Sequence, residues 1–385
     1  MKQQDNNSWT IGILFSRSGN MQIPATQHVF GALLAIDEIN ASGGILGRPL
    51  EAIQYDTRSD LGLYRQFADR LLTEDGVSNI IGCCTSLSRK VVLSSIERRN
   101  ALLWYPDLYE GFEYSTNVLY IGPATNQNSL PLARYLFRQG ARRFLLIGSD
   151  YIYPREANRV MRDLVSRHAG EVLDEIYAPL EPSDVELDRI VSRIRALKPD
   201  VVFSTLVGES ICRFCRRHAD AADDLSGVLL ASHNITEAEL FAVNRPECIG
   251  VITAAPYFSS IDSVQNNAFV SHFRSRFGEE APVSQYAASS YSAIRLFAAA
   301  LQRAGEMNTE RIAQCALELE LDAPHGRIAL DPNNNHTWQT ARVGTWNGRD
   351  AFDLVWESTQ PVQPDPWLVS YGGAEELSEN GQPGS

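Results

Sequence analysis

The chain has 385 residues, a formal net charge of −13 and a pI near 5.1. Its length allows two or three domains, and its 44% hydrophobic and 21% charged residues are ordinary for a globular protein. A chain this acidic gains no affinity from the release of counterions on a nucleic acid. We therefore expect no direct binding to DNA or RNA, although a partner protein that binds nucleic acid is compatible with this charge.

The N-terminal residues predict where the protein is located. Residues 1–8 are polar and lead straight into a strand-like run, without the apolar stretch and small-residue cleavage site of a secretory signal. No apolar run in the sequence approaches the roughly 18 residues that cross a membrane. We expect a cytoplasmic protein without a membrane segment, unless an export signal has been removed from the sequence.

The cysteines do not predict a disulfide framework or a metal site. Cys212 and Cys215 have redox or zinc-like spacing, but they fall in a helix-like segment, 209–221, and no second pair completes four ligands. We interpret them as packing residues and expect neither metal nor cofactor. The full set is Cys83, Cys84, Cys212, Cys215, Cys248 and Cys315.

Strand-like and helix-like segments alternate along the first 123 residues. Apolar side chains in the helical segments recur with a period near 3.6, and Gly43-Gly44 closes the first helix as a C-terminal cap. The expected strands are 11–15, 50–55, 79–83 and 102–105, and the expected helices are 28–42, 61–74 and 88–99.

A second series with the same alternation follows. Strands joined by single helices specify parallel sheets, so two such series predict two similar α/β lobes. The expected helices are 127–139, 154–169, 184–196 and 209–221, and the expected strands are 143–148, 172–178, 201–205, 228–231 and 251–254.

The last third contains two long helices, 266–277 and 284–304, followed by short strands. The strands at 327–330, 342–346 and 352–356 need partners in sheets already formed, so the chain must pass between the lobes more than once. We predict three crossovers, near 123–126, 256–260 and 333–337. The first lobe would then comprise 1–123 and 257–335, the second 124–256 and 336–371, and 372–385 would form a flexible tail.

No motif in the sequence indicates catalysis. The sequence lacks the G-x-S-x-G, G-x-x-x-x-G-K-[ST] and H-E-x-x-H patterns, its histidines are scattered, and no carboxylate pair stands out. We assign no catalytic residue and predict a binding protein rather than an enzyme.

Polar and aromatic residues gather where the predicted strands of the first lobe end. Open α/β sheets bind ligands at these carboxyl ends. Cys84-Thr85-Ser86 follows the third strand and opens a helix, whose N–H groups could face a ligand oxygen. The alternative is that the serines there only cap the helix. Tyr105 ends the fourth strand, and Asp107 follows it.

The strand ends of the second lobe carry Tyr151, Tyr153, Val207 and Asn234. Tyrosines from two lobes that face one cleft would enclose a small ligand and offer it hydroxyl groups. Each tyrosine taken alone is more often a core or surface residue. The agreement of several strand-end loops therefore carries this prediction.

At these loops the sequence resembles a known family, the amide-sensing negative regulators of bacterial aliphatic amidase operons. These regulators have the type I periplasmic-binding-protein fold, as do receptors for urea and branched-chain amino acids. The similarity runs from about residue 10 to residue 369. The segments that carry it are YPDLYEGFEYS (105–115), GPATNQNS (122–129), IGSDYIYPRE (147–156), APYFSSID (255–262) and NNNHT (333–337).

The resemblance implies a two-lobed sensor that binds a short amide or a urea-like molecule between its lobes. It further implies that the unliganded protein holds an RNA-binding antitermination protein and releases it when inducer binds. The pocket would include Ser86, Tyr105, Tyr151, Tyr153 and Val207.

Three positions depart from the family pattern. Cys84 replaces a tyrosine, while Asp107 and Asn234 replace threonines, which puts the identity of the ligand in doubt. We predict that Ser86 receives the carbonyl oxygen of the ligand through its N–H and hydroxyl. The Asp107 carboxylate needs a donor, either an N–H-rich ligand or an arginine, unless it caps its own loop.

A transport receptor that delivers urea, short-chain amides or small amino acids to an ABC permease is the main alternative function. An enzyme of unrecognised mechanism is a third possibility. The sequence leaves open whether the chain forms a homo-oligomer.

Overall fold

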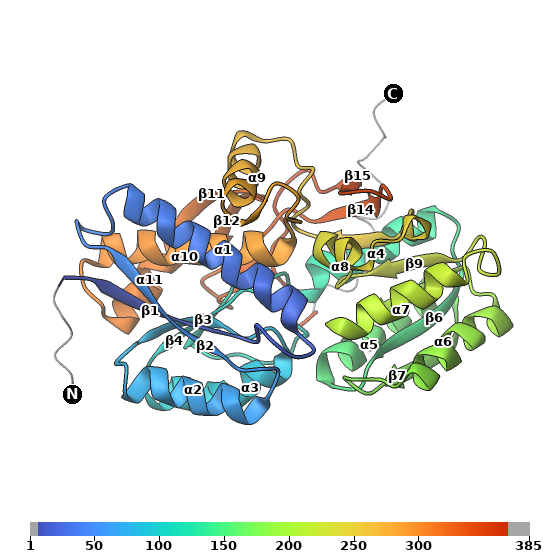
Figure 1. Cartoon of the computed structure of the whole chain (residues 1–385), viewed down its shortest axis with the longest axis horizontal. Helices are drawn as coiled ribbons and strands as arrows, with labels where there is room; N and C mark the ends of the chain where they lie inside the picture. The colour runs from blue at the N-terminus through green and yellow to red at the C-terminus, as the bar shows by residue number, and fades with distance from the viewer. Residues whose placement is uncertain (1–6, 369–385) are drawn as a thin grey trace.

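The computed structural model describes residues 7–368, which form two α/β lobes side by side (Figure 1). The first lobe is built on a five-stranded parallel sheet in the order β2-β1-β3-β4-β5. These strands are β1 (Trp9–Phe15), β2 (Leu50–Asp56), β3 (Asn79–Gly82), β4 (Leu102–Tyr105) and β5 (Val118–Tyr120).

Helices cover both faces of this sheet, because successive side chains of a strand point to opposite faces. Ile13 of β1 packs into the core formed with α1 and α10, and its neighbour Leu14 packs into the core under α2 and α3. The helices of this lobe are α1 (Gln22–Ala41), α2 (Leu61–Thr73), α3 (Ser86–Arg98), α9 (Val264–Phe277), α10 (Gln285–Ala304) and α11 (Thr309–Leu317).

The second lobe contains a seven-stranded sheet in the order β15-β14-β10-β9-β8-β6-β7. The five strands β6 to β10 are parallel to one another. β14 pairs with β10 in the antiparallel sense, and β15 pairs with β14 in the same way. The strands are β6 (Arg143–Ser149), β7 (Glu171–Ala178), β8 (Val201–Thr205), β9 (Leu229–Ser232), β10 (Ile252–Ala255), β14 (Arg342–Trp346) and β15 (Phe352–Glu357).

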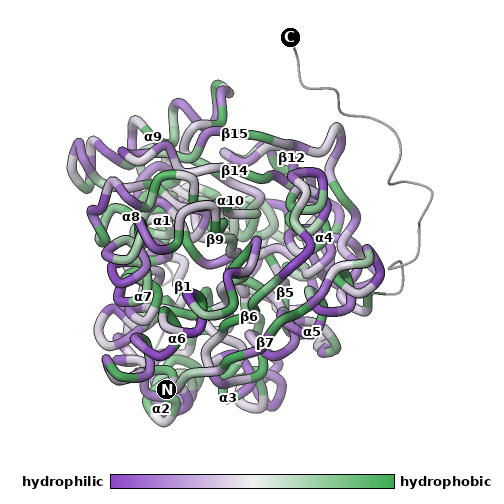
Figure 2. Tube along the Cα trace, turned by 90° about the vertical axis from the view of Figure 1, so that its right-hand side faces the viewer, coloured by the Kyte–Doolittle hydropathy of each residue, from purple (hydrophilic) through white to green (hydrophobic). Residues whose placement is uncertain are grey.

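One face of this sheet packs against α4 and α5, and the other against α6, α7 and α8. Figure 2 shows hydrophobic residues, in green, along inner strands such as β6. The helices are α4 (Thr125–Arg138), α5 (Ile152–Arg167), α6 (Asp184–Leu197), α7 (Glu209–Asp220) and α8 (Glu237–Val243). Within residues 7–368, no helix combines the length and apolar character needed to cross a membrane.

The chain crosses between the lobes three times, so the two-lobed, mainly parallel architecture is confirmed. The first crossing joins β5 to α4, and the second follows β10. The third lies later than the prediction at 333–337. β13 (Thr337–Trp338) still pairs with β12 (Gly326–Leu330), in the small sheet that also contains β11 (Glu320–Ala323).

The asparagine-rich segment therefore forms the turn of a hairpin and not a linker. Asp331 accepts a hydrogen bond from the N–H of Asn333, and the N–H of Asn335 donates to the Asp331 carbonyl. Such local bonds are what Asp and Asn supply in turns. The chain leaves for the second lobe only after Trp338. The predicted tail, 372–385, and the end of the predicted second domain lie outside the described residues.

Candidate functional site

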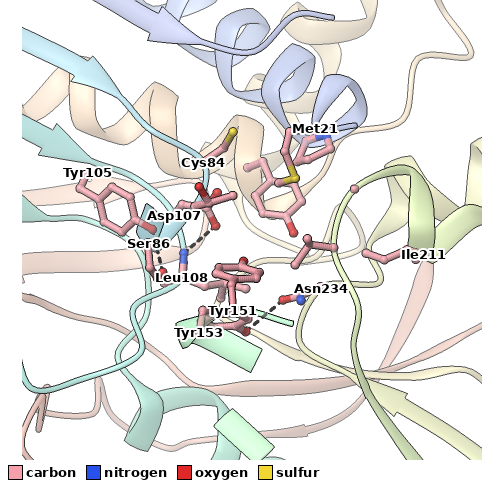
Figure 3. Close-up of a pocket in the computed structure, with 15 residues that line it drawn as sticks. Met21, Cys84, Ser86, Tyr105, Asp107, Leu108, Tyr151, Tyr153, Ile211 and Asn234 are labelled. Carbon is pink, nitrogen blue, oxygen red and sulfur yellow. Dashed lines mark hydrogen bonds between the residues drawn. The ribbon is translucent and has the colours of Figure 1, made fainter. Parts of the chain in front are cut away.

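The carboxyl ends of strands from both sheets lie around a cavity between the two lobes (Figure 3). It holds about 320 Å³ of space including its open mouth. All nine predicted site residues line it, and their roles in binding stay predictions. The lining is Met21, Pro24, Cys84, Thr85, Ser86, Tyr105, Asp107, Leu108, Tyr151, Tyr153, Val207, Gly208, Ile211, Asn234 and Tyr286.

Helix α3 points its N-terminus at the cavity from the first lobe. The cap is Thr85, whose hydroxyl accepts a hydrogen bond from the N–H of Ser88 at 3.1 Å, while the Ser88 hydroxyl accepts from the Thr85 N–H at 3.1 Å. This reciprocal capping box makes Thr85 the cap, where we expected a serine. The N–H of Ser86 lies in the first turn, where a helix leaves N–H groups without intrahelical partners.

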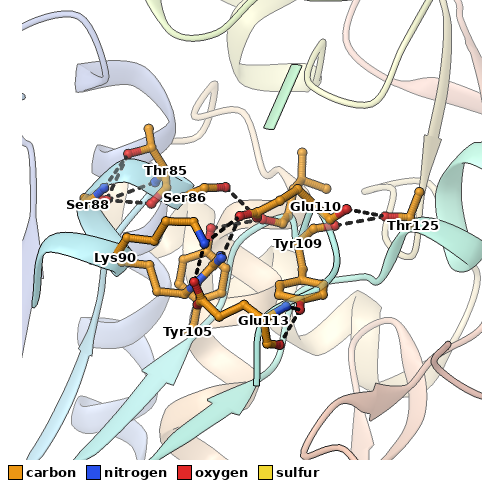
Figure 4. Close-up of polar contacts among 11 residues, drawn as sticks. Thr85, Ser86, Ser88, Lys90, Tyr105, Tyr109, Glu110, Glu113 and Thr125 are labelled. Carbon is orange, nitrogen blue, oxygen red and sulfur yellow. Dashed lines mark hydrogen bonds and ion pairs between the residues drawn. The ribbon is translucent and has the colours of Figure 1, made fainter. Parts of the chain in front are cut away.

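The Ser86 hydroxyl is already engaged within the protein. It donates to Oε2 of Glu110 at 2.6 Å, so its hydrogen is not available for a ligand carbonyl. This corrects the predicted role of the hydroxyl. The backbone N–H is the only group of Ser86 that can still donate to a ligand. Glu110, on the loop after β4, is 2% exposed and its Oε1 accepts from Arg89 at 2.8 Å (Figure 4).

Arg89 holds the side chains of Glu110 and its neighbours in place next to the cavity. It is fully buried and also pairs with Glu113 at 2.8 Å. Burial alone would lower the pKa of Arg89, but the Glu110 carboxylate holds that pKa well above its ordinary value. The guanidinium therefore stays charged and fixes the loop after β4 against α3.

The same guanidinium stacks on the ring of Tyr105, at 4.7 Å from the ring centre. The Tyr105 hydroxyl donates to the carbonyl of Leu108 at 2.9 Å. Tyr105 is therefore held by its ring and its hydroxyl at once. It forms a rigid part of the first-lobe wall, and its hydroxyl hydrogen is already used.

Asp107 has donors on both carboxylate oxygens. Oδ1 accepts from the N–H of Leu108 at 2.6 Å, and Oδ2 lies 3.3 Å from Nε2 of His28. Gly122 lets the chain approach here, since a Cβ at that position would lie 1.9 Å from the Asp107 carbonyl oxygen. The carboxylate caps its own loop and also lines the cavity. Its protein partner is a histidine, where we expected an arginine or the ligand alone.

The other ring nitrogen of His28, Nδ1, lies 2.8 Å from the hydroxyl of Ser290. The order of serine, histidine and aspartate resembles that of a hydrolase triad. Ser290, however, is fully buried and does not line the cavity, so its hydroxyl is inaccessible to a substrate. The arrangement instead fixes the position of Asp107.

Three further phenols line the cavity, those of Tyr151 and Tyr153 from the second lobe and that of Tyr286 from α10 of the first lobe. Tyr153 donates to Oδ1 of Asn234 at 3.0 Å, and Nδ2 of Asn234 donates to the Leu206 carbonyl at 2.9 Å. Among residues 7–368, no protein group hydrogen-bonds the hydroxyls of Tyr151 and Tyr286. Burial raises the pKa of both phenols well above 10, so both stay protonated.

Sequence reasoning missed several lining residues. Met21 and Pro24 follow the carboxyl end of β1, so the rule used for the other strands applies to them as well. Tyr286 lies on α10, and the partners Glu110 and His28 carry no strand-end signal.

All six cysteines are buried and unpaired.

The comparison with known families decides what kind of protein this is. The model described as "Periplasmic binding protein domain" matches residues 9–372. The chain belongs to this family. It is 25% identical over 218 residues to a Leu/Ile/Val-binding protein homolog of Brucella melitensis, a match covering 56% of this chain and 55% of that protein. The matched region thus spans about half the length of that curated relative.

Longer matches agree with this assignment. The Leu/Ile/Val-binding protein BraC3 of Rhizobium johnstonii is 21% identical over 348 residues, which cover 88% of this chain and 91% of that protein. An ABC-transporter solute-binding protein of Rhodopseudomonas palustris, solved with 3,4-dihydroxybenzoic acid, superimposes with a TM-score of 0.85. It is 18% identical, and the match covers 93% of this chain and 99% of that chain. The fold is therefore that of a two-lobed ligand-binding protein.

Proposed function

We propose that the protein is a receptor for a small N–H-rich molecule of the urea, short-chain amide or amidine class, and that it serves an ABC transporter. The ligand class is supported by one observation: within residues 7–368, Asp107 is the only charged side chain that lines the cavity. A carboxylate accepts hydrogen bonds and donates none, so it favours N–H donors and disfavours an anionic ligand.

The other available groups suit the same molecule. The N–H of Ser86 would donate to a carbonyl oxygen, and the free hydroxyls of Tyr151 and Tyr286 would donate or accept on either side. The small cavity favours a ligand of a few non-hydrogen atoms. The names of the relatives, two Leu/Ile/Val-binding proteins and one solute-binding protein of an ABC transporter, support the role of receptor.

A thermal-shift screen followed by calorimetry tests the ligand class. We expect urea, acetamide or formamidine to raise the melting temperature and to bind more tightly than benzoate or isoleucine. A ligand at 100 times its Kd adds about 2.7 kcal/mol of stability. Tighter binding of benzoate or isoleucine than of every urea or amide would refute the proposal.

The second candidate is the cytoplasmic sensor that the sequence resemblance implies. Six buried, unpaired thiols suit a reducing compartment, where disulfides are rare. Such a sensor would change its affinity for an RNA-binding antitermination protein when it binds ligand, because a ligand shifts an equilibrium only by differential binding.

Cell fractionation of the native host separates the two functions. A transport receptor is expected outside the cytoplasmic membrane, and the sensor inside it. For a cytoplasmic protein, pull-down with and without the bound amide would then show ligand-dependent release of the RNA-binding partner. Equal partner capture in both conditions would rule out the sensor.

A further inference from the structure

A second cavity adjoins the first on the far side of Cys84. It holds about 470 Å³ including its mouth, and Met21, Cys84 and Thr85 line both cavities. We call it the annex and define it by the residues that line it without lining the first cavity, which are Ser16, Asn20, Ser59, Leu61, Tyr64, Leu87, Leu180 and Glu181. It lies between the lobes, since Leu180 follows β7 of the second lobe.

The hydroxyl groups of Ser16, Tyr64 and Ser59 in the annex already have partners within the protein. Ser16 Oγ lies 2.7 Å from Thr57 Oγ1 and donates to the hydroxyl of Tyr64 at 3.1 Å. Ser59 Oγ accepts from the N–H of Met21 at 3.0 Å. A guest in the annex therefore need not supply hydrogen bonds, and an apolar group can enter without leaving these groups unpaired.

Apart from Asn20 and the solvent-exposed Glu181, the remaining lining of the annex is largely hydrocarbon. Leu61, Leu87 and Leu180 contribute their side chains to its lining. Burying an alkyl group against such side chains is favourable by the hydrophobic effect. The annex therefore differs in character from the first cavity, where Asp107 and the phenols lie.

Small and flexible side chains separate the two cavities. Cys84 is compact, and its Sγ lies 3.3 Å from the Tyr64 hydroxyl on the annex side. Met21 is unbranched, and its thioether adapts to the shape of its neighbours. Thr85 also lines both cavities, so an alkyl chain attached to a head group in the first cavity would pass Met21, Cys84 and Thr85 on its way into the annex.

We propose that the annex is a subsite for a short alkyl substituent, so that the ligand is an N-alkylurea or a longer aliphatic amide. This inference rests on the proposed function, because it assumes a urea or amide head beside Asp107. The head would be held by polar contacts in the first cavity, and the tail by Leu61, Leu87 and Leu180 in the annex.

Calorimetric titration with urea and its N-methyl, N-ethyl, N-propyl and N-butyl derivatives tests the subsite. Each added methylene should tighten binding about fourfold until the annex is filled. In Leu180→Trp, an indole would fill the annex; the backbone carbonyl of Leu180, which accepts from Ser210, is retained. This variant should bind urea as the native protein does and lose the gain with chain length. Leu354→Trp, on the outer strand β15, is the matched control and should keep it.

The outcomes separate the two proposals. If no urea or amide binds, the proposed function is wrong; if urea binds and the alkylureas bind no more tightly, only the subsite is wrong. A gain that persists in Leu180→Trp would also overturn the subsite. Saturation-transfer NMR with n-butanol, which lacks the head, tests the annex by itself. We expect transfer to its alkyl protons in the native protein and in Leu354→Trp but not in Leu180→Trp; equal transfer in all three, or none, refutes the subsite.

Discussion

The loop after β1 and the start of α7 tie the two lobes together at the cleft. The N–H of Glu209 donates to the carbonyl oxygen of Asn20 at 2.8 Å and to Oδ1 of Asn20 at 3.0 Å. Gly208, just before it, has φ +63° and ψ −140°, and a Cβ there would lie 2.3 Å from the Asn20 oxygen. Two-lobed binding proteins close around their ligands by hinge motion. Contacts that exist only in the closed form add to ligand affinity without touching the ligand.

We therefore expect Asn20→Ala to weaken ligand binding although Asn20 does not line the first cavity. The substitution removes one of two acceptors that share a single N–H, a loss of about 0.5–1 kcal/mol. Affinity should fall about two- to fivefold. In Gly208→Ala the new methyl group would collide with the Asn20 carbonyl in the closed form, at a cost of roughly 1–3 kcal/mol. That corresponds to a loss of about 5- to 150-fold.

Calorimetry with the tightest-binding compound of the screen measures these losses, and small-angle scattering with and without that compound reports closure. Asn20→Asp is the matched control, because it keeps an acceptor and places a negative charge at the N-terminus of α7, which the helix dipole favours. It should bind as the native protein does. Native affinity in both Asn20→Ala and Gly208→Ala would show that this contact does not stabilise the closed form.

Three further predictions concern the site and its support. Tyr151→Phe removes an unpartnered hydroxyl and should weaken ligand binding about 2- to 12-fold in calorimetry without changing the melting temperature; equal loss of stability would mean a structural role. Arg89→Met removes the buried cation closest to the Glu110 carboxylate and leaves it only Lys90 at 3.7 Å and the Ser86 hydroxyl, so it should lower the free energy of unfolding by about 3–5 kcal/mol, with recovery in the double variant carrying Glu110→Gln. Stability is best measured by heat, since urea and guanidinium resemble the expected ligands, and a double variant no more stable than Arg89→Met would contradict the pairing. Burial raises the pKa of Glu239 to about 7, above its unfolded value of 4.5, so the folded state binds the extra proton and stability falls as pH rises between these values. Burial raises the pKa of Glu237 to about 7 as well, so Glu239→Gln should remove only the part of the decline that Glu239 causes, up to about 3 kcal/mol. The melting temperatures of the two proteins from pH 4.5 to 7.5 should therefore diverge; parallel curves would refute it.

The alternation of strands and helices predicted the lobes because each long element carries its own periodic signal. The elements that were missed are short or weakly patterned, such as β5, β11 and α11. β5 has three residues and is specified by its neighbour β4, with Tyr105 opposite Tyr120. Tertiary pairing of this kind leaves no local pattern in the sequence.

The candidate site was predictable to the extent that it is made of strand ends. The position of a strand end follows from topology, so the sequence alone places Tyr151 and Asn234 at one cleft. The hydrogen-bond partners could not be placed in this way. His28 reaches Asp107 from a helix 79 residues away in the sequence. The Ser86 hydroxyl was assigned to a ligand because the approach of Glu110 depends on how the loop after β4 folds.

Fold likeness alone does not choose the ligand, because function depends on the site that a fold carries. The solute-binding protein of Rhodopseudomonas palustris has this fold and was solved with a dihydroxybenzoic acid, so the architecture accommodates a carboxylate in that protein. In the present chain such an anion would share a small cavity with Asp107, and none of the described residues that line it is a lysine or arginine that could offset the repulsion. A zwitterionic amino acid could place its ammonium group against Asp107, but its carboxylate would then have only uncharged donors, the N-terminus of α3 and the hydroxyls of Tyr151 and Tyr286. Urea carries no charge that needs compensation and four N–H groups that a carboxylate can accept. Comparing urea with glycine in one titration therefore tests whether Asp107 selects for hydrogen-bond donors or for positive charge.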